Sequence, residues 1–280
     1  MFFTTIDWIS LTFERRDYNA RTFASIYSPS TTSETATAHH GYDTATRNKN
    51  GVVCMWHTRR EEMGLHVVFS GSALRNIFEQ RGVHPQEIIK TASLVGASVT
   101  RLDLARDAQN EQINLRAIKT AVEMGENKGN ARTWAEMTSA KKGYTLYVGS
   151  RTSEKFIRMY NKGAEQGDIN ADWQRFEIEC KGMIARAAAK AICDKVSIGA
   201  VFDDLAMASL ELPNCPDYGR LFPAYETKFS LPKIERHTDT EKWIITQVIP
   251  AVEGFFERNP ESKVYEKLVD MLVRLAQIRE

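Results

Sequence analysis

The sequence lacks the features that mark membrane proteins and disulfide-rich secreted proteins. No run approaches 18 consecutive apolar residues, and the first residues show no basic segment followed by an apolar one, so neither a spanning helix nor a classical signal peptide is expected. The 280 residues include only four cysteines, none in a Cys-x-x-Cys pair. This argues against a zinc knuckle and fits a reducing cytoplasm.

An excess of one charge is also missing. The 37 basic and 36 acidic residues leave a net charge of +1, which excludes a globally basic nucleic-acid coat protein but permits a local basic patch. No Walker A motif is present, so the chain is not expected to drive unwinding with ATP. The composition, 42% hydrophobic and 26% charged, is that of a globular protein with a sizeable core.

What is present is a series of short strands with β-branched and aromatic residues, interrupted by a few amphipathic helices. Strands are predicted at 6–13, 51–56, 65–69, 99–105, 143–150, 155–162 and 173–180. Helices are predicted from an N-cap at Ser72, at 85–94, at 113–124 and at 184–193. Strands joined by short turns favour an α+β fold, with a central antiparallel sheet and helices packed on one side.

Polar residues alternate along three of these strands. Because residues i and i+2 of a strand share a face, each strand presents one polar face. The faces carry, strand by strand, Arg101, Asp103 and Asp107; Arg158, Tyr160 and Lys162; and Arg175, Glu177 and Glu179. If they point the same way, they form a site of carboxylates, arginines and a tyrosine. The alternative is a solvent face with cross-strand ion pairs.

Such a cluster has a definite chemistry. Carboxylates gathered together repel one another unless a cation lies among them, and oxygen ligands suit Mg²⁺ or Mn²⁺. A tyrosine beside arginines suits attack on a phosphodiester, because guanidinium groups neutralise the charge that develops on the phosphoryl oxygens.

A basic segment lies between residues 141 and 162. Its six cations face one acid, Glu154, and Tyr144 and Tyr147 are interleaved with them. Phosphate contacts combined with aromatic stacking are typical of single-strand binding, although a solvated hairpin would show the same charge run. The predicted nucleic-acid contacts are Arg101, Lys141, Lys142, Tyr144, Arg151 and Lys155.

Five blocks in order carry a family resemblance. They read IDWISLTF, GLHVVFSGSALR, VTRLDLARD, GYTLYVGSRTSEKFIRMYNKGAE and WQRFEIECKG, and YVGSRTSEKFIRMYNK is the most distinctive part. Over roughly residues 5–195 the chain resembles the replication initiation factor family, which includes rolling-circle initiators of plasmids and phages and some conjugative relaxases. That family is similar to the HUH endonucleases.

The resemblance implies a nicking and strand-transfer reaction. A tyrosine cleaves one strand at an origin, keeps the 5′ phosphate as a phosphotyrosine and frees a 3′-OH; religation follows the same chemistry. The nucleophile falls on Tyr160, and Arg158 and Arg175 would stabilise the added negative charge. Lys162, a metal ion or a carboxylate would help the phenol to ionise, and the residues do not choose among these.

The resemblance also implies a divalent cation, Mg²⁺ or Mn²⁺. Its expected ligands are Asp103 and Glu177, with Glu179 and Asp107 as further candidates. The His-hydrophobic-His signature of the wider superfamily is absent, and His66 has no partner at that spacing.

Two other functions stay open. A conjugative relaxase would share the chemistry, and a DNA-binding regulator that kept the fold would lack it. The expected partners are origin DNA, both as duplex and as single-stranded nick site, a host helicase, and a second copy of the chain as a homodimer. No membrane partner is expected, and the location is the cytoplasm of a host cell.

The domain organisation follows from composition. Residues 1–211 are predicted to form the catalytic domain, and the proline-punctuated stretch 212–240 a linker or wrapping segment. Residues 241–280 are predicted to form a small helical module, which either packs on the catalytic domain or serves dimerisation or origin recognition.

Overall fold

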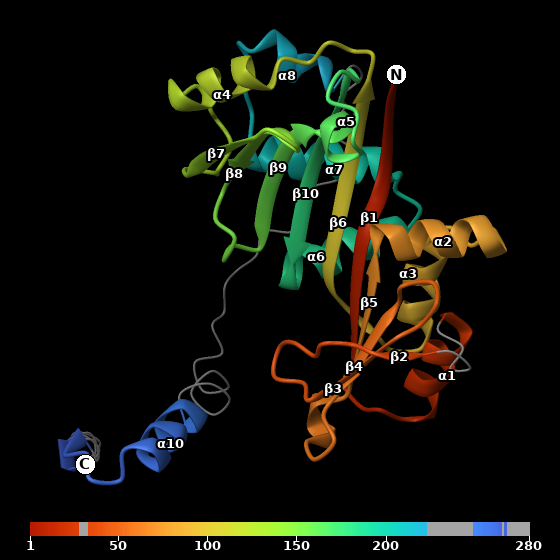
Figure 1. The fold of residues 1–280 in the computed structure, drawn as a ribbon, viewed down its shortest axis with the longest axis vertical. Helices are drawn as coiled ribbons and strands as arrows, with labels where there is room; N and C mark the ends of the chain where they lie inside the picture. Colours follow the sequence, from red (N-terminus) through yellow and green to blue (C-terminus); the bar gives the residue numbers. More distant parts are fainter. Residues whose placement is uncertain (28–32, 223–248, 265, 268–280) are drawn as a thin grey trace. The chain divides into compact units, whose positions relative to one another are not determined.

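A computed structural model describes residues 1–27, 33–222, 249–264, 266 and 267. The chain divides into two compact units, 1–232 and 233–280. The first unit holds the sheet and the helices packed on it (Figure 1). In the second unit the described residues include the helix α10 (Ile249–Arg258). The remaining predictions for 223–248 and for the end of the chain lie outside the described residues.

The described part of the first unit is built on one ten-stranded antiparallel sheet. Its strands are β1 (Phe2–Phe13), β2 (Glu34–Thr35), β3 (Thr44–Arg47), β4 (Val53–Trp56), β5 (Leu65–Ser70), β6 (Ser98–Gln109), β7 (Trp134–Ser139), β8 (Gly143–Val148), β9 (Lys155–Asn161) and β10 (Trp173–Lys181). They lie in the order β2-β3-β4-β5-β1-β6-β10-β9-β8-β7. The long strands β1, β6 and β10 are therefore neighbours at its centre.

The helices of this unit are mostly short and amphipathic. They are α1 (Tyr18–Tyr27), α2 (Gly71–Arg81), α3 (Pro85–Leu94), α4 (Leu115–Glu123), α5 (Lys162–Glu165), α6 (Gly182–Cys193), α7 (Ile198–Ser209) and α8 (Pro216–Arg220), with a 3₁₀ turn at Glu61–Met63. Helices α6 and α7 pack on β6, β10 and β1, where their alanines and large apolar side chains are buried (Figure 1). The predicted α+β fold with an antiparallel sheet is confirmed.

The strand register brings the three predicted polar faces to one side of the sheet. Arg175 of β10 lies between Asp107 of β6 and Tyr160 of β9. Two residues along, Glu177 lies opposite Arg158. Intervening residues such as Leu102, Leu104, Phe176 and Ile178 point to the other side and form the core under α6 and α7.

A β-bulge interrupts β1. Ile6 pairs with Leu104 and Trp8 pairs with Asp103, so Asp7 is an extra residue with no partner on β6. Counted back from Ile9, strict alternation would put Asp7 on the core face, whereas counted forward from Ile6 it would put Asp7 on the polar face. With the bulge, both Asp7 and Trp8 line the polar face, and alternation continues from Trp8.

Local boundaries differ from the sequence predictions in two places. The N-cap of α2 is Ser70, whose hydroxyl accepts from the Ala73 amide, and not Ser72. The segment 212–222 packs into the core of the first unit, where Tyr218 is 1% exposed.

The described residues contain no helix that is long and apolar enough to cross a membrane.

Candidate active site

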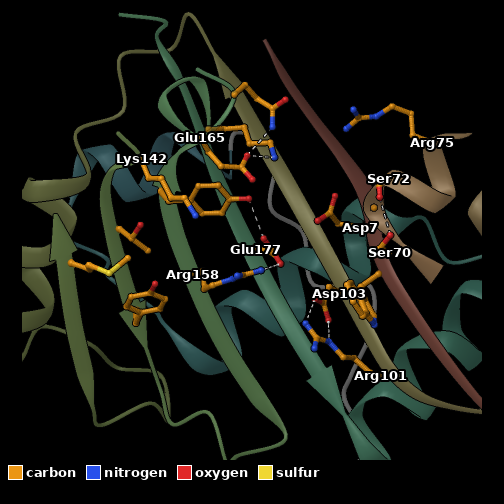
Figure 2. Close-up of a pocket in the computed structure, with 18 residues that line it drawn as sticks. Asp7, Ser70, Ser72, Arg75, Arg101, Asp103, Lys142, Arg158, Glu165 and Glu177 are labelled. Atoms are coloured by element: carbon orange, nitrogen blue, oxygen red, sulfur yellow. Dashed lines mark hydrogen bonds and ion pairs between the residues drawn. The ribbon is translucent and has the colours of Figure 1, made fainter. Parts of the chain in front are cut away.

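A pocket of about 560 Å³ opens on the polar face of the sheet. Residues from β1, β5, β6, β7, β8, β9, β10, α2 and α5 line it (Figure 2). Its lining includes seven of the predicted site residues: Arg101, Asp103, Lys142, Arg158, Tyr160, Lys162 and Glu177. Three others, Asp107, Arg175 and Glu179, lie on the same face but are buried in its wall.

Tyr160, Glu177 and Arg158 form a connected group. The Tyr160 hydroxyl donates to Glu177 Oε2 at 3.3 Å, and Arg158 Nη2 donates to Glu177 Oε1. Burial and the negative charge of Glu177 raise the pKa of Tyr160 above its ordinary value, because both disfavour the phenolate. Tyr160 therefore enters any reaction at neutral pH as a phenol, with a carboxylate already accepting its hydrogen bond.

Arg175 pairs in register with Tyr160, but its side chain binds two aspartates. It donates to both oxygens of Asp107, at 2.9 and 2.7 Å, and Trp173 Nε1 donates to the same carboxylate at 2.6 Å. Its Nη1 donates to Asp7 Oδ1 at 2.8 Å. Asp107 is 0% exposed, so this bidentate pair is part of the wall and is closed to a ligand.

Asp103 lies at the other end of the pocket. Arg101 donates to both of its oxygens, at 2.8 and 2.6 Å, and also contacts Glu179 at 2.8 Å. Burial raises the pKa of Asp103 to about 7, since desolvation outweighs the attraction of Arg101. The guanidinium of Arg101 in turn lies over the ring of Trp8 at 4.7 Å.

Asp7 is a pocket residue that the sequence analysis missed. It reaches the pocket through the bulge in β1, beside the start of α2. Gly71 makes this approach feasible, because a Cβ there would lie 2.8 Å from Asp7 Oδ1. The acid stands in the first resembling block, but alternation gives conflicting answers for it when counted from Ile6 and from Ile9. Ser70, Ser72 and Arg75 also line the pocket and were not predicted.

The donor chemistry of the pocket suits a hard cation, but the arrangement does not. Among the described residues, no three His, Cys, Asp or Glu side chains are placed to hold a metal ion. The expected ligands Asp103, Asp107, Glu177 and Glu179 each contact an arginine instead. The residues as they lie therefore do not form a metal site.

The predicted nucleic-acid contacts are divided between the two faces. Lys142 lines the pocket and Lys141 is exposed in the turn before β8. Tyr144 lies on the opposite face, 6% exposed, with its hydroxyl on Glu136. Lys155 pairs with the buried Cys180 and therefore also faces away from the pocket. These two residues are not placed to touch a ligand in the pocket.

Tyr147, which was not among the predicted contacts, is the tyrosine of β8 that lines the pocket. It lines the pocket opposite Arg158, and its ring stacks on Phe156 with centroids 5.7 Å apart. The guanidinium of Arg151 lies over both rings, 4.9 Å from Phe156. Thr145 pairs with Tyr160, and residues i and i+2 of a strand share a face, so Tyr147 lies on the same face as Tyr160.

Comparisons with known proteins agree with this fold. Residues 97–215 match the sequence model of the family described as replication initiation factor, which confirms the resemblance noted above. The structure is similar to that of a rolling circle replication initiator protein from Geobacillus stearothermophilus, with a TM-score of 0.62 and 20% sequence identity, covering 76% of this chain and 87% of that one. No curated protein shows a significant sequence match.

Proposed function

We propose that the protein is a rolling-circle replication initiator that nicks one strand of origin DNA with Tyr160. The observation that carries the proposal is the hydrogen bond from the Tyr160 hydroxyl to Glu177, 3.3 Å long, inside a pocket that is also lined by arginines. The family match over 97–215, which includes all three strands of the polar site, supports the same reaction class.

The reaction follows from the positions of these groups. The Tyr160 oxygen attacks the scissile phosphorus and forms a new P–O bond, while Glu177 takes the phenol proton as general base. The bond from phosphorus to the 3′ oxygen breaks, and that oxygen takes up a proton to become a free 3′-OH. The 5′ phosphate stays on Tyr160. Because one phosphodiester replaces another, religation needs no ATP.

Arginine positions the reacting phosphate. Arg158 lines the pocket two residues before Tyr160 on β9, and its Nη2 donates to Glu177 Oε1. Its Nε is buried without a hydrogen-bond partner. A guanidinium with donors to spare is suited to phosphoryl oxygens that gain charge in the transition state. Arg175 acts through Asp7 and the wall, as a positioning residue.

A divalent cation stays a prediction, and no step above depends on one. Binding a cation at Asp103 or Glu177 requires their arginine partners to move, because those carboxylates are already occupied. A host helicase, a homodimer and the choice between initiator and relaxase are likewise predictions that rest on the resemblance.

The experiment that tests the proposal is covalent capture of DNA. Purified full-length protein is incubated with supercoiled DNA that carries the origin of its own replicon, with Mn²⁺, with Mg²⁺ and with chelator. The products are resolved on a denaturing gel. We expect an adduct whose phosphorylated residue maps to Tyr160 by mass spectrometry, and none with the Tyr160→Phe variant.

Tyr144→Phe is the matched control, because it removes a hydroxyl from a tyrosine on the opposite face. It should form the adduct at the wild-type level. An adduct that persists in Tyr160→Phe would move the nucleophile elsewhere. Binding without an adduct under all three conditions would favour the DNA-binding regulator, and an adduct formed in chelator would overturn the predicted cofactor.

A further inference from the structure

The charges that line the pocket do not balance one another. Four acids line it, and each has a cationic partner: Asp7 with Arg175, Asp103 with Arg101, Glu165 with Lys162, and Glu177 with Arg158. Five cations line the same pocket. Two of them, Arg75 and Lys142, have no acidic partner among the described residues, whereas the other three are paired.

The two unpaired cations stand on opposite sides of the pocket. Arg75 comes from the second turn of α2, and Lys142 from the turn that leads into β8. Figure 2 shows Glu177 and Asp7 between them. Both side chains are exposed, so each is free to reach an anion that enters the pocket between them.

We infer that Arg75 and Lys142 bind backbone phosphates of the substrate strand, one on each side of the scissile phosphate. This inference rests on the proposed function and adds to it the path of the DNA strand over the protein. The DNA would cross the β-strands of the sheet, from the α2 side to the β8 side, and would not follow the length of any one β-strand.

The dimensions agree with a short single-stranded stretch. In the sheet order, five strand spacings separate β5, which leads directly into α2, from β8. At ~4.8 Å per spacing this amounts to ~24 Å. A stacked single strand rises about 3.4 Å per nucleotide, so at most about seven nucleotides span the two cations.

The inference is tested by the salt dependence of binding. All proteins carry Tyr160→Phe so that no covalent product forms, and the probe is a fluorescent oligo(dT) strand, because phosphate contacts do not depend on sequence. For single strands, the slope of log K against log salt is negative, and each phosphate contact makes it steeper by about 0.7. We expect Arg75→Ala and Lys142→Ala each to make the slope shallower by about 0.7, and the double variant to make it shallower by about 1.4.

Lys90→Ala is the matched control, since Lys90 is an exposed cation on α3, which packs against α6 and does not line the pocket. Its slope should equal that of the Tyr160→Phe parent. An unchanged slope in Arg75→Ala, or a loss as large in Lys90→Ala, overturns the inference.

A second measurement tests the two-sided arrangement. With the nick-site strand shortened from its 5′ end, one of the two variants should lose its effect on the slope, and with the strand shortened from its 3′ end the other should. If both variants respond to the same truncation, the two cations do not flank the scissile phosphate. Failure of the proposed function would show differently, as absence of the Tyr160 adduct in the otherwise unaltered protein.

Discussion

Two buried arginines, Arg175 and Arg106, belong to consecutive residue pairs of the ladder between β10 and β6, and they lie on opposite faces of the sheet. Arg175 of β10 pairs in register with Asp107, and Arg106 of β6 pairs with Phe176. They are equally buried, at 5% and 6% exposure. Arg106 contacts Asp203 at 2.5 Å, Thr4 at 2.9 Å and a backbone carbonyl at 2.8 Å, under the rings of Phe202 and Phe222.

The two arginines differ in whether their partners line the pocket. None of the Arg106 partners, Asp203, Thr4 and the Leu221 carbonyl, lines the pocket. Arg175 has one partner, Asp7, that lines the pocket with 26% of its side chain exposed. Burial, full hydrogen bonding and ion pairing are thus shared by both arginines. The two arginines differ in that Arg175 binds a pocket residue, Asp7, and Arg106 does not. We therefore assign a positioning role to Arg175 and only a stabilising role to Arg106.

The largest effect is expected from removing Arg175. Arg175→Ala leaves Asp107 charged, unpaired and fully buried, which costs about 3–5 kcal/mol of unfolding free energy. Arg106→Ala should cost less, about 1–3 kcal/mol, because Asp203 is 17% exposed and regains water. Urea unfolding of both variants measures this order. Equal losses would contradict the argument that the buried acid sets the cost.

The next effect concerns the proposed general base. Glu177→Gln keeps the shape of the side chain but removes its ability to take the Tyr160 proton, so the rate of adduct formation should fall by about 10²–10⁴-fold. Asp203→Asn, at the corresponding partner of Arg106, should leave the rate per folded molecule unchanged. Single-turnover gel assays compare the two. A rate for Glu177→Gln within tenfold of wild type, a change of about 1.4 kcal/mol, would assign the proton to another group.

A smaller effect should separate the two tyrosines of β8. Tyr147→Ala removes a ring from the pocket and should weaken binding of a single strand by about 1–3 kcal/mol, the usual contribution of one stacked base. Tyr144→Phe, on the opposite face, should bind as the wild type does. Fluorescence anisotropy with an oligo(dT) strand measures both. Equal affinities for all three proteins would remove Tyr147 from the binding surface.

The smallest effect is on the pH dependence of stability. Because burial raises the pKa of Asp103 to about 7 from 3.8, the folded state keeps a proton there that the unfolded state has lost, and stability falls as pH rises through this range. Asp103→Asn cannot ionise. The unfolding free energy of Asp103→Asn should therefore fall less than that of the wild type between about pH 5 and about pH 8, by on the order of 1–2 kcal/mol. This figure is smaller than 1.36 kcal/mol per pKa unit would give, because the substitution also changes the Arg101 contact. The urea midpoints of both proteins at the two pH values give the comparison. An unchanged pH dependence would mean that another group is responsible.

The strands and their polar faces were predictable because a period of two depends only on local sequence. That period placed Arg158 with Tyr160, and Glu177 with Arg175, and the antiparallel pairing then brought both strands to one side. The prediction that these side chains share a face is confirmed by the register. Their catalytic roles stay predictions.

The misses share a physical cause, which is that pairing partners are not encoded locally. A charge count does not show which face a residue takes, so Tyr144 and Lys155 were grouped with the pocket although they point away from it. Arg75 lies on a helix that meets the pocket only through the tertiary fold. The divalent cation stays a prediction, and the arginine contacts of its four expected ligands likewise depend on rotamers and register that composition does not reveal.

The bulge in β1 has a consequence for protein engineering. With Asp7 deleted, β1 would alternate without interruption, since Ile6 and Ile9 would still face the core and Trp8 and Ser10 would still face the pocket side. The sheet therefore does not require a residue at this position. Most positions of a central strand tolerate a substitution but not a deletion, whereas Asp7 is suited to deletion. A chain without Asp7 would separate the contribution of this carboxylate to the pocket from the contribution of β1 to the fold.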